Sequence, residues 1–387
     1  MNYIVSFALL IVALISPQLY QQGGILIRFN KNHPATLNRH HAPGYKFEIK
    51  LADKVRNCED HILDTASGWA ILSCDFSRDK WNSVMGFYSQ HDTTEGGIFL
   101  YDYSNRHSSD NKLVHVQLKD YSLDGIDFHP LGISYHAASQ TLFVSNNARS
   151  GNRIEVFKLD LNHGTADYVR TIRHAHLPAP NSIHALSATE LYVTNDHYFP
   201  HRQHGFLSKI ETLLAFPLAG IAHVDISGPE VKVETVARHP FPNGIAHLNE
   251  TTWAVSSTSS ATVRLYHVDP ATKKWTQKDS IAMPMFTDNL SVDEEGTLWV
   301  SGHPHTFSLD AVAHSRLECN SPEGRLSDKC KSMSAPSWVV SWTQSGGVKD
   351  VYVDDEYWAS TTASRDVKAK MGLISGLYGD GVLVWTE

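Results

Sequence analysis

Short stretches that alternate apolar and polar positions recur along the chain, and each follows a polar or glycine-containing segment. In the clearest unit, residues 286–300, the adjacent polar residues Asp288 and Asn289 precede an apolar strand, an acidic turn and a second strand. Weaker copies cover residues 131–144, 181–193 and 241–255. The units recur about every 45–60 residues, which is the spacing expected of β-propeller blades.

A further unit starts at Cys58–His61, and the last is expected within Val348–Val384. Counting these starts predicts an all-β fold, a six-bladed β-propeller with a central channel over residues 58–387. A strand from the N-terminal region is expected to complete the last blade. Residues 18–57 are predicted to form an irregular N-terminal segment, and residues 305–345 the longest insertion.

Two segments leave alternatives open. The apolar spacing within Lys209–Leu218 fits either a small helix over the channel mouth or a connection between strands. The apolar run Ile4–Ile15 is shorter than the roughly 20 residues that span a bilayer, so residues 1–17 are interpreted as a signal peptide or an uncleaved signal-anchor. We therefore expect the protein to be secreted or to lie in the lumen of the secretory pathway. An anchored form, or peripheral membrane association through the N-terminus, is the alternative.

The cysteines and one sequon agree with that compartment. Cys319 and Cys330 flank a short loop, and Cys58 and Cys74 lie on neighbouring predicted strands, so two disulfides are expected. Free buried thiols are the alternative. Asn249 begins a glycosylation sequon in a predicted turn, and we expect a glycan there.

Composition narrows the class of protein. Of the 387 residues, 42% are apolar and 19% are charged, which permits a sizeable core. The net charge of -8, without a basic cluster, disfavours a nucleic-acid partner. A Gly-x-Ser-x-Gly elbow is absent from the sequence, which argues against a serine hydrolase of the α/β-hydrolase type.

The starts of propeller strands face the central channel, so their polar residues should meet there. These residues are Glu59, Asn181, Asn243, Asp288 and Asn289. A single Asn before a strand is ordinarily a turn residue, and only the repeated position favours a ligand role. Two carboxylates and three amides offer only oxygen ligands, which suit Ca²⁺ and suit Zn²⁺ poorly. The pattern therefore predicts a calcium site in the channel.

Three motifs carry a resemblance to a known family. They are Thr-Asn-Asp-His-Tyr-Phe at residues 194–199, Phe-Pro-Asn-Gly-Ile at 241–245 and Asp-Asn-Leu-Ser-Val-Asp at 288–293. From about Cys58 onward the chain resembles the serum paraoxonase/arylesterase family, which is related to the gluconolactonase and strictosidine-synthase-like propellers. The resemblance implies a six-bladed propeller with Ca²⁺ in its channel that hydrolyses lactones and aryl esters.

The resemblance also implies roles for single residues. The five channel residues match the catalytic calcium ligands of the family, and Asp60 and the backbone carbonyl of Ile133 match two contributors to a structural calcium. Three positions depart from the family pattern. The usual base His is Leu131, its partner His falls at Asn147, and an Asp ligand of the structural calcium is Ser182.

Without that His pair, Asp288 is predicted to act as base or nucleophile, and His303 is the second catalytic candidate. His303 is otherwise a turn residue beside Pro304, and His197 is expected to serve in packing and hydrogen bonding. The predicted function is a calcium-dependent hydrolase whose partner is a small-molecule ester or lactone. The alternatives are a propeller with structural calcium that binds a ligand or catalyses a condensation or isomerisation, and a protein-interaction propeller.

Overall fold

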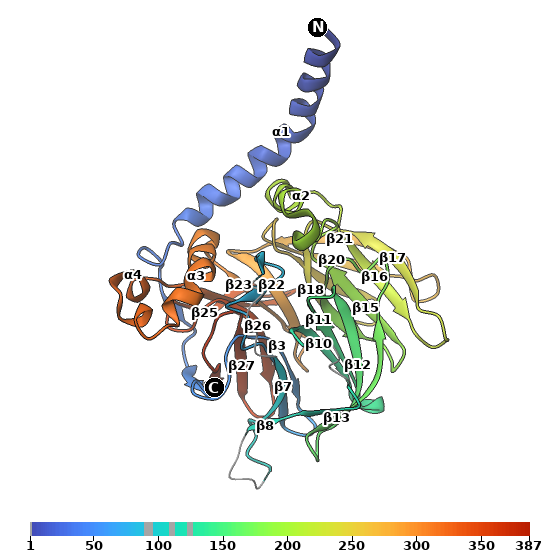
Figure 1. Cartoon of the computed structure of the whole chain (residues 1–387), viewed down its shortest axis with the longest axis vertical. Coiled ribbons are helices and arrows are strands. Elements are labelled where there is room, and N and C mark those ends of the chain that lie inside the picture. The colour runs from blue at the N-terminus through green and yellow to red at the C-terminus, as the bar shows by residue number, and fades with distance from the viewer. Residues whose placement is uncertain (1, 89–95, 108–112, 122–126) are drawn as a thin grey trace.

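Six sheets surround a central channel in the computed structural model of the chain, which describes residues 2–88, 96–107, 113–121 and 127–387 (Figure 1). The innermost strand of each sheet contacts the next around the ring, and the last contacts the first. These inner strands are β3 (Cys58–Asp64), β10 (Pro130–His136), β14 (Pro180–Ala185), β18 (Pro242–Asn249), β22 (Phe286–Val292) and β26 (Ser360–Asp366). The predicted six-bladed β-propeller is confirmed.

Each blade continues outward from its inner strand. The first blade continues through β4 (Trp69–Cys74), β7 (Gly97–Asp102) and β8 (Leu113–His115). The second continues through β11 (Thr141–Asn146), β12 (Arg153–Asp160) and β13 (Thr165–Ile172), and ends with the parallel strand β9 (Gln117–Lys119). The third continues through β15 (Glu190–Asn195), β16 (Gly220–Asp225) and β17 (Lys232–Arg238). The fourth and fifth continue through β19 (Thr252–Ser257), β20 (Thr262–Val268) and β21 (Trp275–Ala282), and through β23 (Leu298–His303), β24 (Ser337–Thr343), β25 (Gly347–Asp354) and β1 (His40–His41). The sixth continues through β27 (Met371–Gly376), β28 (Val382–Thr386) and β2 (Lys46–Lys50), while β5 (Trp81–Asn82) and β6 (Phe87–Tyr88) form a separate hairpin.

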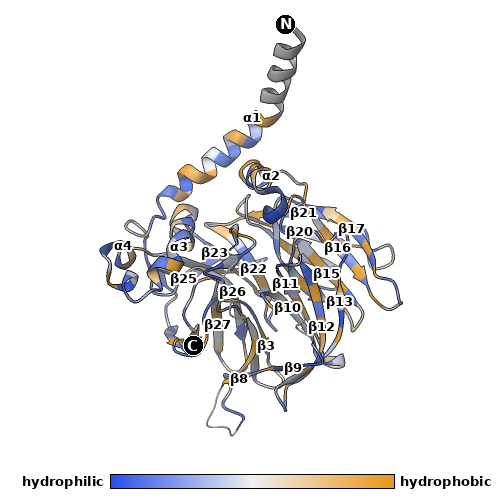
Figure 2. Ribbon diagram, in the orientation of Figure 1, coloured by the Kyte–Doolittle hydropathy of each residue, from blue (hydrophilic) through white to orange (hydrophobic). Residues whose placement is uncertain are grey.

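The core lies between neighbouring blades. Because side chains alternate across a strand, each blade presents apolar residues to both neighbours. Ile71, Leu100 and Leu142, for example, are fully buried in one cluster between the first two blades. Figure 2 shows hydrophobic residues interspersed with hydrophilic ones along the blade strands.

The first and last parts of the chain close the ring. β2 pairs antiparallel with β28, with Phe47 opposite Trp385 and Ile49 opposite Leu383. The final blade is thus completed from the N-terminal region, as predicted. The disulfides Cys58–Cys74 and Cys319–Cys330 are both formed, which also agrees with the prediction.

The prediction of an irregular segment at residues 18–57 is wrong for its first part and for the short strands β1 and β2. A helix, α1 (Asn2–Asn30), continues into the segment as far as Asn30, and the N-terminal half of the helix stands away from the propeller (Figure 1). One face of α1 is ordered by packing, because Ile25 and Phe29 are buried one turn apart against Ala261 and Phe286. In the part of the chain that the structure describes, none of the helices has both the length and the apolar character needed to cross a membrane.

Other differences concern the connections. Residues 209–218 belong largely to a helix, α2 (His201–Leu214), rather than to a strand connection. The expected insertion at 305–345 contains α3 (Thr306–Cys319) and α4 (Asp328–Lys331), but it also supplies the blade strand β24. The apolar run at 351–353 was expected in the last blade, whereas it lies in β25 of the fifth, because an apolar strand by itself does not reveal its blade.

Candidate active site

A cavity of about 380 Å³ lies at the end of the channel beneath α1 and α2. Four of the five predicted metal ligands line it, and each comes from a different blade. They are Glu59 on β3, Asn181 on β14, Asn243 on β18 and Asp288 on β22. The fifth, Asn289, borders a second chamber further down the channel, and its side-chain amide contacts Glu59. Residues far apart in sequence therefore meet at the channel axis.

Local irregularities of the backbone orient these side chains toward the channel axis. In every blade the pairing of the inner strand with its neighbour shifts register near the start of the strand, as it does between Thr287 and Leu290 in β22. Such bulges turn a side chain out of the regular alternation. Gly244 also permits close approach, because a Cβ there would lie 2.6 Å from the Cα of Asn289.

The protein holds one polar atom of each ligand candidate. Nδ2 of Asn243 donates to Oγ1 of Thr258 over 3.2 Å, and Nδ2 of Asn181 donates to Oδ2 of Asp196 over 3.5 Å. Nδ2 of Asn289 donates to Oε1 of Glu59 over 3.0 Å. Because each of these amide nitrogens donates to a neighbouring protein group, the contacts leave the amide oxygens free.

The remaining oxygen of each candidate is buried without a hydrogen-bond partner. The five atoms are Glu59 Oε2, Asn181 Oδ1, Asn243 Oδ1, Asp288 Oδ1 and Asn289 Oδ1. A buried acceptor without a partner costs about 1–3 kcal/mol. A single cation bound by several of these oxygens would satisfy them together, and a set containing only oxygen ligands fits a hard cation such as Ca²⁺.

Electrostatics favour the same interpretation. Burial raises the pKa of Glu59 well above its usual range, and the nearby carboxylates of Asp60 and Asp288 add to that rise. A positive ion would offset this repulsion. Within the described ranges no three His, Cys, Asp or Glu side chains are grouped to hold a metal, and three of the five oxygens here come from amides instead.

His303 completes the polar part of the cavity. It ends β23, and its Nε2 lies 2.8 Å from Oδ2 of Asp288. Its Nδ1 is buried without a partner, and the residue lines the cavity. Both catalytic candidates of the sequence analysis are thus in contact with each other. His197 differs, because both of its ring nitrogens contact protein groups, Asp196 at 2.9 Å and Thr212 at 2.7 Å.

The lower chamber, about 370 Å³, does not fit a second cation in the same way. Oδ1 of Asp60 accepts hydrogen bonds from the backbone N–H of His61 and from Thr362, and Oδ2 accepts one from the N–H of Ile133. No oxygen of Asp60 or Ser182 is a buried side-chain atom without a partner. Of the two residues implied for a structural calcium, Asp60 is therefore already hydrogen-bonded through both oxygens, one of them to the N–H of Ile133.

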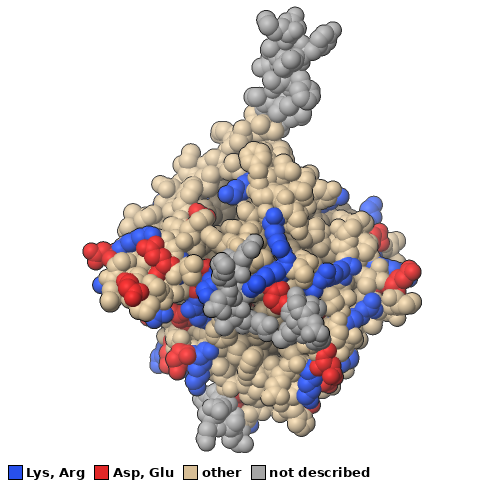
Figure 3. All heavy atoms as spheres, in the orientation of Figure 1, with Lys and Arg blue, Asp and Glu red and all other residues tan. Residues whose placement is uncertain are grey.

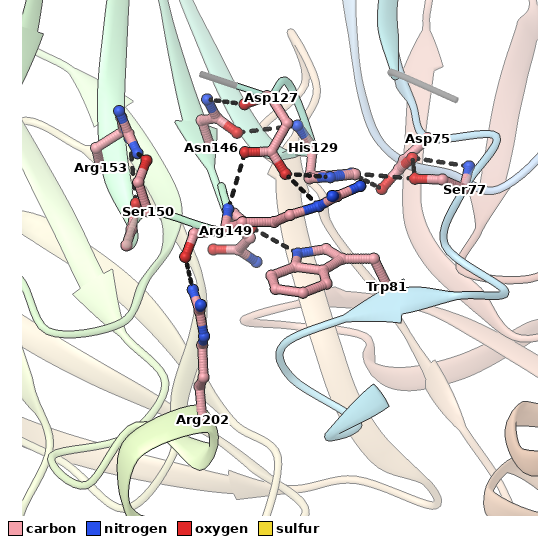
Figure 4. Close-up of polar contacts among 12 residues, drawn as sticks. Asp75, Ser77, Trp81, Asp127, His129, Asn146, Arg149, Ser150, Arg153 and Arg202 are labelled. Atoms are coloured by element: carbon pink, nitrogen blue, oxygen red, sulfur yellow. Dashed lines mark hydrogen bonds and ion pairs between the residues drawn. The ribbon is translucent and has the colours of Figure 1, made fainter. Parts of the chain in front are cut away.

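At Leu131 and Asn147, where the family pattern has its His pair, no side chain offers a proton acceptor to the cavity. Leu131 is buried and forms part of the apolar wall. Near Asn147, a separate histidine cluster joins the first two blades, with His129 between Asp127 at 2.8 Å and Asp75 at 3.1 Å (Figure 4). Trp81 of this cluster donates to the backbone oxygen of Asn147, but His129 does not line the cavity.

Sequence reasoning missed the residues that form the upper cavity wall. Gln22 and Leu26 of α1 reach it one turn apart, and Ser259 lines it from the turn between β19 and β20. The spacing of Gln22, Ile25, Leu26 and Phe29 was the available signal for a packed helix face. The neighbouring Gly23 and Gly24 obscured it.

Comparison with known proteins supports the fold and identifies the family. A sequence profile of the family described as "Arylesterase" matches residues 58–321, more than half of the chain. Serum paraoxonase/arylesterase 2 of Rattus norvegicus and serum paraoxonase/arylesterase 1 of Homo sapiens are each 28% identical over 230 residues. These alignments cover 58% of this chain and 62% of each relative, so the chain spans less than two thirds of their length.

Solved structures agree on the fold. A gluconolactonase from Xanthomonas campestris superposes with a TM-score of 0.54 at 13% identity, covering 90% of this chain and 93% of its own. A luciferin-regenerating enzyme superposes with a TM-score of 0.52 at 12% identity, covering 89% and 96%. At these identities the similarity concerns the fold alone, whereas the sequence profile identifies the family. The chain belongs to the arylesterase family.

Proposed function

We propose that this protein is a calcium-dependent hydrolase of lactones or aryl esters that acts in the cavity beneath α1 and α2. The observation that carries the proposal is the set of five buried side-chain oxygens without partners beside the Asp288–His303 pair. Glu59, Asn181, Asn243, Asp288 and Asn289 would hold the ion. Membership of the arylesterase family supports the same activity.

The chain's own residues supply the proton transfer. Asp288 accepts a hydrogen bond from Nε2 of His303, which fixes the tautomer whose Nδ1 is a free acceptor facing the cavity. His303 then takes the proton of the water that attacks the carbonyl carbon, and the Asp288 carboxylate stabilises the imidazolium that forms. When the scissile C–O bond breaks, the imidazolium returns that proton to the leaving oxygen. The bound Ca²⁺ would polarise the scissile carbonyl and stabilise the negative charge on its oxygen.

The walls suit an apolar substrate. Apolar side chains surround the polar floor from four separate parts of the chain, and Phe307 adds a ring at the rim; the four are Leu26, Leu131, Phe241 and Phe286. Apolar walls hold the hydrocarbon part of an ester and exclude bulk water from the reacting groups.

A panel of aryl esters and lactones tests the proposal. The purified protein should hydrolyse members of the panel, lose the activity on removal of calcium with EDTA and regain it when calcium is added. His303→Gln should lower kcat by roughly 10²–10⁴-fold while calcium content is kept. Full hydrolysis by metal-free protein would refute the proposal.

One observation favours a second candidate. Because Leu131 replaces the usual base with an apolar side chain, the site can instead serve a non-hydrolytic reaction or ligand binding with structural calcium. Under this alternative the protein binds esters or lactones, with calcium present, and releases no acid product. Product analysis by mass spectrometry separates the two functions.

We also propose that the protein is secreted and associates peripherally with membranes through the face that carries α1 and α2. Large apolar side chains are exposed there: Tyr20, Ile27, Phe206, Leu213 and Phe307. Figure 3 shows few charged side chains near these helices, whereas the lower rim carries both signs. Flotation with neutral phosphatidylcholine vesicles should recover the protein, and Phe206→Ser with Ile27→Ser should reduce the recovery. Equal recovery of this variant would refute the proposed membrane face.

A further inference from the structure

Several buried polar atoms without partners belong to residues of the active-site cavity. Four on its floor, with that of Asn289 beside them at the lower chamber, are oxygens of carboxylates and amides, which accept only. The ring nitrogens Nδ1 of His303 and of His201 are two more, and the upper wall adds Nε2 of Gln22 and Oγ of Ser259. Gln22 is 6% exposed and Ser259 is 4% exposed, so neither side chain is freely hydrated. The wall atoms are donors, and they need a different partner from the floor.

These two residues lie on elements that pack against each other. Ile25 and Phe29 of α1 are clustered with Ala261, two residues after Ser259 in the same turn. Phe29 also makes an edge-to-face contact with Phe286, with ring centroids 4.9 Å apart. Gln22 and Leu26 belong to the neighbouring part of the same helix and line the cavity together with Ser259. Packing of α1 thus holds both donors at one cavity.

The chemistry of the donors defines what they bind. The Gln22 side-chain nitrogen only donates hydrogen bonds, and the Ser259 hydroxyl can donate one. The wall around them is otherwise largely apolar, with Leu26, Phe241 and Phe286 among its residues. An oxygen carried on a hydrocarbon chain, as a keto, hydroxy or ether group, satisfies both requirements. A substrate with a plain hydrocarbon chain would leave both donors unpaired. A site with buried hydrogen-bonding groups binds such a substrate less well than one that pairs with them.

We propose that Gln22 and Ser259 bind a second oxygen of the substrate, remote from the scissile bond. The protein therefore prefers lactones or esters whose side chain carries an oxygen over the same compounds without it. The inference rests on the proposed function for the reaction at the floor. It adds that the N-terminal helix determines specificity.

The test compares two γ-lactones that differ only in one keto group on the alkyl side chain. For the wild-type protein we expect kcat/KM to favour the keto compound by roughly 3–10-fold, the range of one or two net hydrogen bonds. Gln22→Leu and Ser259→Ala should each lower this ratio, and the double variant should bring it close to one. Because the ratio compares two substrates on one protein, a general loss of folding or activity cancels.

Matched controls come from the same two elements. Gln21→Leu alters the exposed neighbour on α1, and Ser260→Ala alters a serine of the same turn that does not line the cavity. Both controls should keep the wild-type ratio. A wild-type ratio of one, or a ratio that survives in the Gln22→Leu, Ser259→Ala double variant, would overturn the inference.

A binding experiment separates this inference from the proposed hydrolysis. The corresponding γ-lactams, with and without the keto group, resist hydrolysis and are tested by thermal shift. If no lactone is turned over but the keto lactam stabilises the wild type more than the plain lactam, and Gln22→Leu removes the difference, the donor pair stands and the hydrolase proposal fails. Equal or absent stabilisation by the two lactams in the wild type overturns the donor pair.

Discussion

Glu59 and Asp60 are consecutive buried carboxylates on β3, yet their surroundings are opposite. Glu59 has one oxygen held by Asn289 and one without a partner. Asp60 has both oxygens in hydrogen bonds to backbone and hydroxyl groups. Burial of both is nearly complete, so exposure does not distinguish them. The difference shows that a carboxylate with a free oxygen is available to a ligand, whereas a satisfied one joins strands.

The partners of Asp60 explain its structural role. Ile133 is on β10 and Thr362 is on β26, so one side chain links three neighbouring inner strands. Glu59 and Asp288, in contrast, line the upper cavity with one oxygen each that has no protein partner. The upper end of the channel therefore offers free ligand oxygens, whereas the carboxylate at the lower end is used to join strands.

Of the changes that test this comparison, Asp288→Asn should have the largest effect. This change removes a charged ligand and weakens the contact that orients His303. We expect kcat/KM for a simple aryl ester to fall by roughly 10²–10³-fold or more, with the melting temperature in EDTA little changed. Steady-state kinetics and a thermal melt measure the two quantities. Wild-type turnover by this variant would remove Asp288 from the mechanism.

Asp60→Ala should affect stability instead. It leaves the N–H groups of His61 and Ile133 and the hydroxyl of Thr362 without their acceptor. We expect the free energy of unfolding to fall by about 2–4 kcal/mol, as measured by urea denaturation. Calcium content of the folded variant should remain that of the wild type. Loss of calcium without loss of stability would reverse the assigned roles of the two carboxylates.

The same comparison extends to two histidines. His303 has a free nitrogen in the cavity, whereas both nitrogens of His129 contact carboxylates of the first two blades. Burial opposes protonation of His129, but its hydrogen bonds to the carboxylates of Asp127 and Asp75 outweigh that effect, and the pKa of His129 is raised. Its protonated form therefore stabilises the fold fully below the unfolded pKa of about 6.5, and this stabilisation is lost as the pH rises through the folded pKa.

His129→Gln should accordingly show a smaller effect, and a pH-dependent one. We expect it to lower the free energy of unfolding by about 1 kcal/mol more at pH 6 than at pH 8.5. Urea denaturation at the two pH values measures this difference, and the exposed His40→Gln serves as the control with no such change. A deficit that is equal at both pH values would show that the protonated form of His129 contributes nothing.

The sequence was sufficient for the blades but not for the choice between neighbouring carboxylates. Alternation and repeated polar starts predicted six blades and the five channel residues, because both depend on local pattern. The bonding of Asp60 depends on Ile133 and Thr362, which are 73 and 302 residues away, so no local pattern reveals it. The role of Gln22 depends on the packing of α1 against residues near Ala261 and Phe286, and a short stretch of sequence does not reveal that packing either.

Counting calcium ions tests the central claim most directly. The protein is equilibrated with calcium, freed of excess ion by gel filtration and measured by mass spectrometry of the metal against protein concentration. The account predicts one tightly bound calcium per chain, which is lost in a variant that combines Glu59→Gln with Asp288→Asn. Two ions per chain would contradict the interpretation of the lower chamber, and none would contradict the site itself.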